Sequence, residues 1–301
     1  MKAITVYSKS LVAIAMTLFC VQGLAQVKDQ SAPLVKNISP KKVTPKGKEI
    51  LFEIRTSFGT MKGKLYNTTP IHRDNFVKLV QENYYDSLLF HRVINQFMIQ
   101  GGDPGSRNAA ADKPLGNGGP GYTLKAEILP ALFHKKGVLS AARQPDNVNP
   151  EKRSSGSQFY LVQGKVYSEQ MLKTQEQRVN QSNSNKIIRD YLRNPENKAD
   201  LDAVSYCQKN KLDDSLSNII ARISAVVSKN QTPFTFTPDQ RNAYSTVGGT
   251  PHLDNGYTVF GEIIEGLSVI DKIAAIPVGP KSRPKENVIM TIRILDQNTK
   301  Q

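Results

Sequence analysis

The stretch from Phe90 to Asp103, FHRVINQFMIQGGD, places an arginine and a glutamine among apolar and aromatic residues. The guanidinium of Arg92 offers several N–H donors and keeps its positive charge at any working pH. The amide of Gln100 can donate and accept hydrogen bonds. A single arginine is usually one half of a surface ion pair, so a catalytic interpretation of Arg92 depends on the residues around it.

Other patterns that support chemistry are missing from the sequence. Cys207 has no CxxC partner and no base near it in sequence, so we interpret it as a small packed side chain. His72 and His134 show no metal-ligand spacing with carboxylates or with this cysteine, and we expect no metal site. Gly101-Gly102-Asp103 and Gly118-Gly119-Pro120-Gly121 lack the form of a phosphate-binding loop and indicate turns, so no cofactor is expected.

Many short strands must position this segment. From Ile50 the chain alternates, with Ile50, Phe52 and Ile54 on one face and Leu51, Glu53 and Arg55 on the other, and this predicts a hairpin with the strand that ends at Tyr66. Thr69 and Pro70 predict the N-cap and first turn of a helix that ends near Asn83. Further strands are expected at 88–93, 97–100, 138–142, 159–162, 257–264 and 288–295, and a second helix at 267–274. Many short strands and only two helices favour a closed antiparallel barrel, which leaves no exposed edges.

Residues 165–244 differ from the rest of the chain. They are rich in Gln, Asn, Lys and Asp, and they carry apolar residues at helical spacing, namely Leu216, Ile219, Ile220, Ile223 and Val227. We interpret this stretch as a helical insertion between two strands of the barrel. Its apolar stripe either packs back on the barrel or recruits a partner.

The first residues follow the order of a secretory signal. Lys2 and Lys9 precede an apolar run from Leu11 to Val21, and the small residues near Ala25 suit cleavage. We therefore expect residues 1–25 to be a signal peptide, residues 26–47 a flexible lead-in, and the protein to be periplasmic or extracellular. A lipoprotein anchored at Cys20 is less favoured, because bulky residues precede that cysteine.

Charge and hydropathy narrow the classes of partner. No stretch approaches about 18 to 20 uninterrupted apolar residues, so an integral membrane span is not expected. The formal net charge is +14, but the basic residues are scattered and not interleaved with aromatic residues, and we expect no nucleic-acid partner.

Four motifs together resemble the cyclophilin family. They are FHRVINQFMIQGGD, then GVLSAAR from Gly137, SSGSQFYLV from Ser154, and PHLDNGYTVFGEIIEG from Pro251. The resemblance covers residues 48–164 and 245–296, and it identifies the chain as a bacterial, exported cyclophilin-type peptidyl-prolyl cis/trans isomerase with a helical insertion. It implies a mainly β fold, an eight-stranded closed antiparallel barrel capped by two helices, formed by residues 48–164 and 245–301.

The resemblance also implies a site. Arg92 is the expected donor to the prolyl nitrogen, and Gln100 holds Arg92 or the substrate carbonyl. Phe97, Met98, Phe159 and Leu253 are expected to line the proline pocket, and Ala142 to contact the peptide. His252 stands where cyclosporin-sensitive members carry tryptophan, Arg143 where many carry asparagine, and Tyr257 where many carry histidine. His91 is either a contact at the groove rim or a structural histidine.

The expected activity is isomerisation of X-Pro peptide bonds. Resonance opposes rotation with a barrier of about 18 to 20 kcal/mol, and a twisted prolyl nitrogen gains a lone pair that accepts a hydrogen bond. The expected partners are proline-containing polypeptides, including unfolded exported proteins, and cyclosporin binding should be weak. The alternative is a chaperone or interaction module that captures proline segments with little catalysis.

Overall fold

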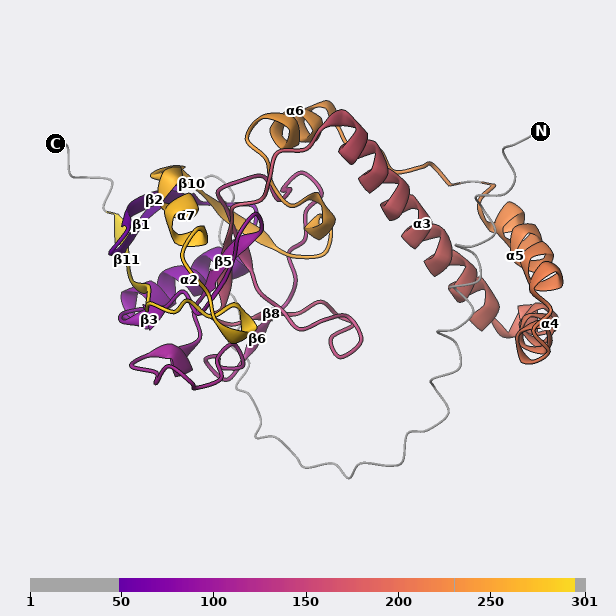
Figure 1. Ribbon diagram of the computed structural model, residues 1–301, viewed down its shortest axis with the longest axis horizontal. Coiled ribbons are helices and arrows are strands. Elements are labelled where there is room, and N and C mark those ends of the chain that lie inside the picture. The colour runs from indigo at the N-terminus through magenta and orange to yellow at the C-terminus, as the bar shows by residue number, and fades with distance from the viewer. Residues whose placement is uncertain (1–48, 230, 296–301) are drawn as a thin grey trace, which may run out of the picture. The chain divides into compact units, whose positions relative to one another are not determined.

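The computed structural model describes residues 49–229 and 231–295, and it divides them into two compact units (Figure 1). The sheet unit contains residues 49–172 and 237–295, and the helical unit contains residues 173–229 and 231–236. The predicted signal peptide and lead-in lie outside the described residues. The boundaries between the two units follow Leu172 and Phe236. The limits predicted for the insertion, residues 165 and 244, stay a prediction.

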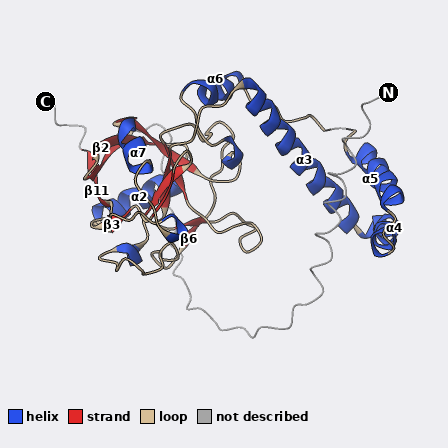
Figure 2. Cartoon of the chain, in the orientation of Figure 1, coloured by secondary structure: helices blue, strands red, loops and turns tan. Residues whose placement is uncertain are grey.

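Antiparallel strands, drawn in red in Figure 2, make up most of the sheet unit's framework. Nine of them form one sheet in the order β3-β11-β1-β2-β10-β7-β9-β5-β4. Their bounds are β1 Ile50–Thr56, β2 Gly59–Leu65, β3 Leu88–Leu89, β4 Arg92–Ile94, β5 Met98–Gly101, β7 Val138–Ala141, β9 Phe159–Val162, β10 Val259–Glu265 and β11 Ile289–Leu295. A separate pair consists of β6 (Thr123–Leu124) and β8 (Ser154–Ser155).

The mainly β, antiparallel character of the prediction is confirmed, but the closed eight-stranded barrel is wrong. The two edges of the curled sheet are β3, which pairs with β11, and β4, which pairs with β5. Within the described part of the chain no ladder joins β3 to β4. Residues 88–93 were predicted as one strand, but the strand is interrupted at Phe90 and His91. Its two parts, β3 and β4, lie at opposite edges of the sheet and are not hydrogen-bonded to each other as strands.

The predicted first hairpin is confirmed, and it begins the core. Strands β1 and β2 pair in antiparallel register, from Ile50 opposite Leu65 to Thr56 opposite Gly59. Phe52 and Ile54 are fully buried, whereas Arg55 on the other face is exposed. They pack in a core with residues of α2 (Pro70–Gln81) and α7 (Leu267–Ala274), including Phe76, Leu79, Ile270 and Ile273.

Helix α2 begins where Thr69 and Pro70 predict, but the capping group is different. Thr69 occupies the N-cap position without a side-chain cap hydrogen bond. Instead, the carboxylate of Glu127 accepts hydrogen bonds from the backbone N–H groups of Ile71 and His72, each 3.0 Å long. Local sequence predicts the cap position, whereas a residue 55 positions beyond His72 supplies the acceptor.

Single turns of 3-10 helix complete the sheet unit, together with α6 (Pro238–Thr246). The 3-10 turns are η3 Pro104–Ser106, η5 Pro251–Leu253 and η6 Pro280–Ser282. Helix α6 carries a full capping box between Thr237 and Gln240.

The helical unit has its own core. It is built from α3 (Glu169–Arg193) beyond residue 172, α4 (Lys198–Lys209) and α5 (Asp213–Val227), with η4 (Pro195–Asn197) before α4. Leu216, Ile220 and Ile223 of the predicted apolar stripe are buried, and they cluster with Ile188, Leu192, Val204 and Cys207. The stripe thus packs on neighbouring helices of its own unit, and Cys207 is the packed side chain that the sequence predicts. No helix in the described ranges is long and apolar enough to cross a membrane.

Candidate active site

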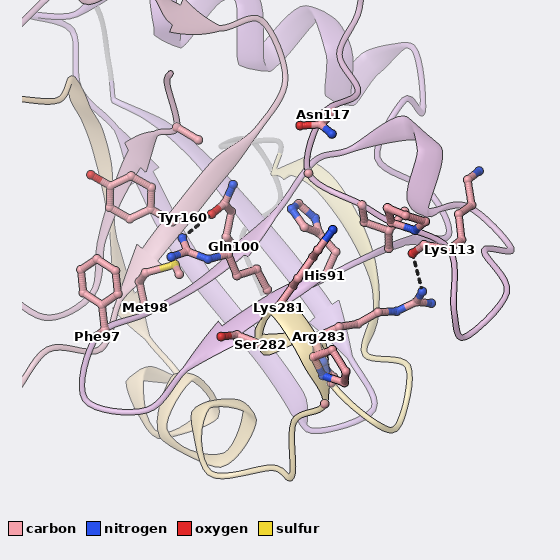
Figure 3. Close-up of a pocket in the computed structure, with 18 of the residues that line it drawn as sticks. His91, Phe97, Met98, Gln100, Lys113, Asn117, Tyr160, Lys281, Ser282 and Arg283 are labelled. Carbon is pink, nitrogen blue, oxygen red and sulfur yellow. Dashed lines mark hydrogen bonds between the residues drawn. The ribbon is translucent and has the colours of Figure 1, made fainter. Parts of the chain in front are cut away.

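An open groove of about 1030 Å³ crosses one face of the sheet unit. Its apolar half is lined by Phe97, Met98, Tyr160, Leu253 and Tyr257. Its basic half is lined by the segments 111–117 and 279–285, which carry Lys113, Lys281, Arg283 and Lys285. Figure 3 shows Phe97, Met98 and Tyr160 at one end of the groove, Lys113 and Arg283 at the other, and His91 between them.

Strand register brings the central side chains of the groove into one row. Arg92 of β4 lies opposite Gln100 of β5, Gln100 lies opposite Tyr160 of β9, and Tyr160 lies opposite Ser140 of β7. Residues directly opposite each other in a sheet project from the same face. The pairing of four strands therefore sets the donor, the amide and the aromatic ring side by side.

A chain of amides holds the guanidinium of Arg92. Arg92 Nη1 donates to Gln100 Oε1 at 3.0 Å, and Gln100 Nε2 donates to Gln158 Oε1 at 3.0 Å. Gln158 Nε2 in turn donates to the carbonyls of Gly116 and Gly118, at 3.0 and 2.7 Å. Each amide is thereby fixed in orientation, so Gln100 presents its oxygen to Arg92. Gln158 was not singled out from the sequence, although it lies within the motif SSGSQFYLV.

The environment of Arg92 leaves it a charged donor with unused N–H groups. Partial burial lowers the pKa of Arg92 from its ordinary value, and Tyr257 offsets part of that effect. A guanidinium nevertheless stays protonated in proteins. Arg92 lines the groove and makes no ion pair within the described ranges. Its positive charge is therefore available to a ligand in the groove.

Two aromatic residues of the apolar half, Phe97 and Tyr257, pack against neighbouring side chains. The rings of Phe97 and His252 stack with centroids 5.4 Å apart. The Arg143 guanidinium lies 4.5 Å from the centre of the Tyr257 ring, and Arg143 Nε donates to the Gly256 carbonyl at 2.7 Å. Ala142, Arg143, Leu253 and Tyr257 all line the groove. His252 is not among the lining residues; it is exposed and stacks on Phe97.

Phe159 corrects the sequence prediction. It was expected in the proline pocket, but it is 1% exposed and packs edge-on against Phe76 and Phe90 in the main core. Its neighbour Tyr160 lines the groove instead. Successive residues of a strand project from opposite faces, so the choice between Phe159 and Tyr160 depends on register, which the sequence alone does not reveal.

The ring of His91 forms part of the floor of the groove and is not an exposed rim contact. It is 4% exposed, and neither ring nitrogen has a hydrogen-bond partner of normal geometry within the described ranges. Burial lowers the pKa of His91 to about 4, with Asp103 and the Leu89 backbone offsetting part of the drop. The imidazole is therefore uncharged at neutral pH.

A buried network supports Tyr160 from below. Its hydroxyl lies 3.0 Å from His134 Nε2, and His134 Nδ1 lies 3.0 Å from Asp254 Oδ1. Ser140 Oγ also approaches His134 Nε2, at 3.3 Å, and the Tyr244 hydroxyl donates to Asp254 Oδ2 at 2.6 Å. Tyr244 belongs to α6, so the helix that precedes the last motif is tied to the groove floor through side chains that the sequence did not single out for this role.

The structure thus shows a curled antiparallel sheet with an open groove, in which Arg92 lies between apolar side chains and a basic segment. Comparison with known proteins identifies the class of protein. A family model described as cyclophilin-type peptidyl-prolyl cis-trans isomerase matches residues 51–173 and 220–294. The chain belongs to this family and is a peptidyl-prolyl cis-trans isomerase.

Curated relatives carry the same activity in their names. A peptidyl-prolyl cis-trans isomerase of Staphylococcus aureus (strain COL) is 30% identical over 243 residues, which cover 80% of this chain and 89% of that protein. A bifunctional phosphatase/peptidyl-prolyl cis-trans isomerase of Streptococcus pyogenes serotype M6 is 31% identical over 247 residues, or 81% of this chain. The matched region spans 38% of the streptococcal protein.

A solved structure was also found, a Cryptosporidium parvum cyclophilin-type peptidyl-prolyl cis-trans isomerase. It aligns with a TM-score of 0.49 at 19% identity and covers 83% of this chain and 99% of that chain.

Proposed function

We propose that Arg92 is the catalytic donor of this isomerase and that the apolar half of the groove holds the substrate proline. The single observation that carries this proposal is the row in which Gln100 lies between Arg92, whose guanidinium it holds, and Tyr160. Met98 and Phe97 supply further apolar surface for the proline ring. With the ring held, the carbonyl before the proline is the part that turns.

The chemistry requires only selective stabilisation of the twisted bond. As the bond rotates, resonance is lost and the prolyl nitrogen gains a lone pair. Arg92 donates an N–H to that lone pair, and the hydrogen bond is absent from both planar ground states, so it lowers the barrier without tightening either state. A millionfold acceleration requires about 8 kcal/mol, which one charged hydrogen bond, desolvation and orientation share.

Replacing Arg92 by alanine tests the proposal. Losing one charged donor should lower kcat/KM on a short Ala-Pro-Phe peptide by about 100- to 1000-fold, and Arg92→Lys should recover little of it, because a lysine is not held in the same planar geometry. Arg55→Ala, which removes an exposed arginine outside the groove, is the matched control. Wild-type turnover by folded Arg92→Ala would refute the assignment.

We further propose that the substrates are exported proteins that are folding. Support comes from the secretory pattern of residues 1–25 and from the proline specificity of the family. Cell fractionation with N-terminal sequencing of the mature protein should find it outside the cytoplasm, beginning near Gln26. A cytoplasmic protein that keeps Met1 would contradict export.

Weak cyclosporin binding belongs to the same proposal. His252 occupies the position at which cyclosporin-sensitive relatives carry tryptophan, and its smaller ring is already stacked on Phe97. We expect inhibition only at micromolar or higher concentration, and His252→Trp should strengthen it. A submicromolar inhibition constant for the wild-type protein in a proline-isomerisation assay would contradict this expectation.

A further inference from the structure

The basic half of the groove carries an excess of positive charge that the isomerase mechanism does not use. Lys113, Lys281, Arg283 and Lys285 line it, against a single acidic lining residue, Asp112. Within the described ranges none of these four cations makes an ion pair. The three lysines are exposed, so their ammonium groups are available to a ligand.

The side chain of Arg283 joins the two segments that line the basic half, 111–117 and 279–285. Arg283 Nη1 donates to the carbonyls of Ala110, Ala111 and Lys113, at 2.7, 3.0 and 3.0 Å, and Nη2 donates to that of Ala109 at 3.2 Å. Carbonyl oxygens satisfy its donors but leave its full charge in place. The guanidinium therefore fixes the segment that contains Lys113 to the segment that contains Lys281, and Figure 3 shows one of these hydrogen bonds as a dashed line.

The segment 279–285, which contains Lys281, forms a tight turn. Gly279 N donates to the Arg283 carbonyl at 2.7 Å, and Val278 forms a bridge with Pro284. Lys281 and Ser282 both adopt left-handed backbone angles, with φ of 56° and 59°. Non-glycine residues rarely take this conformation, and here it directs Lys281 toward the part of the groove that contains His91, as Figure 3 shows.

The floor beneath these cations adds little opposing charge. His91 is uncharged at neutral pH. The nearby carboxylate of Asp103 is 2% exposed and is occupied by the backbone N–H groups of Gly105 and Gly116, at 2.7 and 2.5 Å. It weakens the positive potential without offering a partner to the exposed lysines. With Asp112 counted as well, the basic half remains net positive.

We propose that the basic half of the groove is a subsite for an acidic side chain of the substrate, an Asp or Glu a few residues from the proline on one side of it. The inference rests on the proposed function, because the proline in the apolar half sets the register of the bound chain. Exposed ion pairs are individually weak, but several cations around one concave surface attract an anion and raise the rate of association. The preference should therefore be several-fold and sensitive to salt.

Peptide scanning tests this subsite. In a series of peptides with one central Ala-Pro bond, a single Glu is moved through each position on both sides, and each peptide is paired with its Gln counterpart. We expect the Glu/Gln ratio of kcat/KM to reach about 3 to 10 at one or two adjacent positions on one side at low ionic strength. The ratio should fall toward one above roughly 0.15 M salt.

Two triple variants with equal charge change separate the subsite from the general positive charge of the protein. Lys113→Gln, Lys281→Gln and Lys285→Gln together should bring the ratio close to one. Lys125→Gln, Lys229→Gln and Lys272→Gln together remove three exposed lysines outside the groove and should leave the ratio as in the wild type. Equal loss in both triples, no Glu preference at any position, or an equal preference at every position would overturn the proposal.

Affinity distinguishes failure of the subsite from failure of the proposed catalysis. Fluorescence anisotropy of labelled Glu and Gln peptides reports the preference independently of turnover. Arg92-dependent turnover without any Glu preference would refute the subsite alone. A Glu preference in affinity, lost in the basic-half triple but without Arg92-dependent turnover, would support the subsite and refute the catalytic assignment.

Discussion

His91 and Arg92 are neighbours in sequence with opposite electrostatic behaviour. Arg92 keeps its charge at the groove surface, where Gln100 and Gln158 fix its direction. His91 turns into the floor, where burial lowers its pKa from 6.5 to about 4. Two adjacent residues thus give the groove a permanent cation and, beside it, an uncharged buried ring.

Acid should destabilise the protein through His91. Below pH 6.5 its imidazole takes up a proton in the unfolded chain, whereas in the folded protein it does so only near pH 4. The free energy of unfolding therefore falls as the pH decreases through this window, by about 2 kcal/mol between pH 7 and pH 5. Urea unfolding of wild type and His91→Phe at both pH values should show a smaller loss in the variant. Equal losses would contradict the prediction.

The elements of the sheet unit depend on partners that are distant in sequence. Strands β4, β5, β9 and β7 each contribute one residue to the row that contains Arg92. Helix α2 begins on the carboxylate of Glu127, whose own N–H donates to Thr258 Oγ1 of the last motif at 2.9 Å. The start of α2 is therefore linked to the segment that leads into β10.

Removing the carboxylate of Glu127 should destabilise α2 more than removing the hydroxyl of Thr69. Glu127→Ala leaves the N–H groups of Ile71 and His72 without their acceptor, and we expect a loss of about 2 kcal/mol in the free energy of unfolding. Thr69→Val removes a hydroxyl whose contact, with the Tyr66 carbonyl, is 3.4 Å long, and it should cost less than about 1 kcal/mol. Chemical denaturation measures both. The opposite order would indicate that Thr69 caps the helix after all.

At the scale of the whole molecule, the groove belongs entirely to the sheet unit. None of its lining residues lies between 173 and 236. The two ends of the helical unit lie close together, because Phe236 N donates to Glu176 Oε1 at 2.7 Å and Asn180 bonds both the N–H and the carbonyl of Phe234. The helical unit also buries its own apolar stripe. The helical unit therefore has a hydrophobic core of its own and supplies no lining residue to the groove.

Replacing residues 173–236 by a flexible linker of about six Gly and Ser residues should preserve catalysis. We expect kcat/KM on a short peptide to stay within about twofold of wild type, since the linker only has to join ends that already lie close together. Arg92→Ala in the shortened protein should abolish this activity, which controls for contaminating isomerase. A large loss of turnover in a folded shortened protein would show that the helical unit supports the groove.

Local sequence was sufficient for much of this protein. Alternating residues predicted the first hairpin, helical spacing predicted a helix where α5 lies, and four motifs identified the family. These features depend on neighbours within a few residues or on a long shared pattern. They can therefore be predicted from a single sequence.

Only the tertiary structure decided which side chains meet. Register put Tyr160 in the groove and Phe159 in the core, because a strand's two faces differ only by which residue pairs with which partner. Folding also brought Glu127 to α2, joined Arg283 to the segment 109–113, and gave the helical stripe a core of its own. Each of these contacts joins residues too far apart in sequence for any local pattern to pair them.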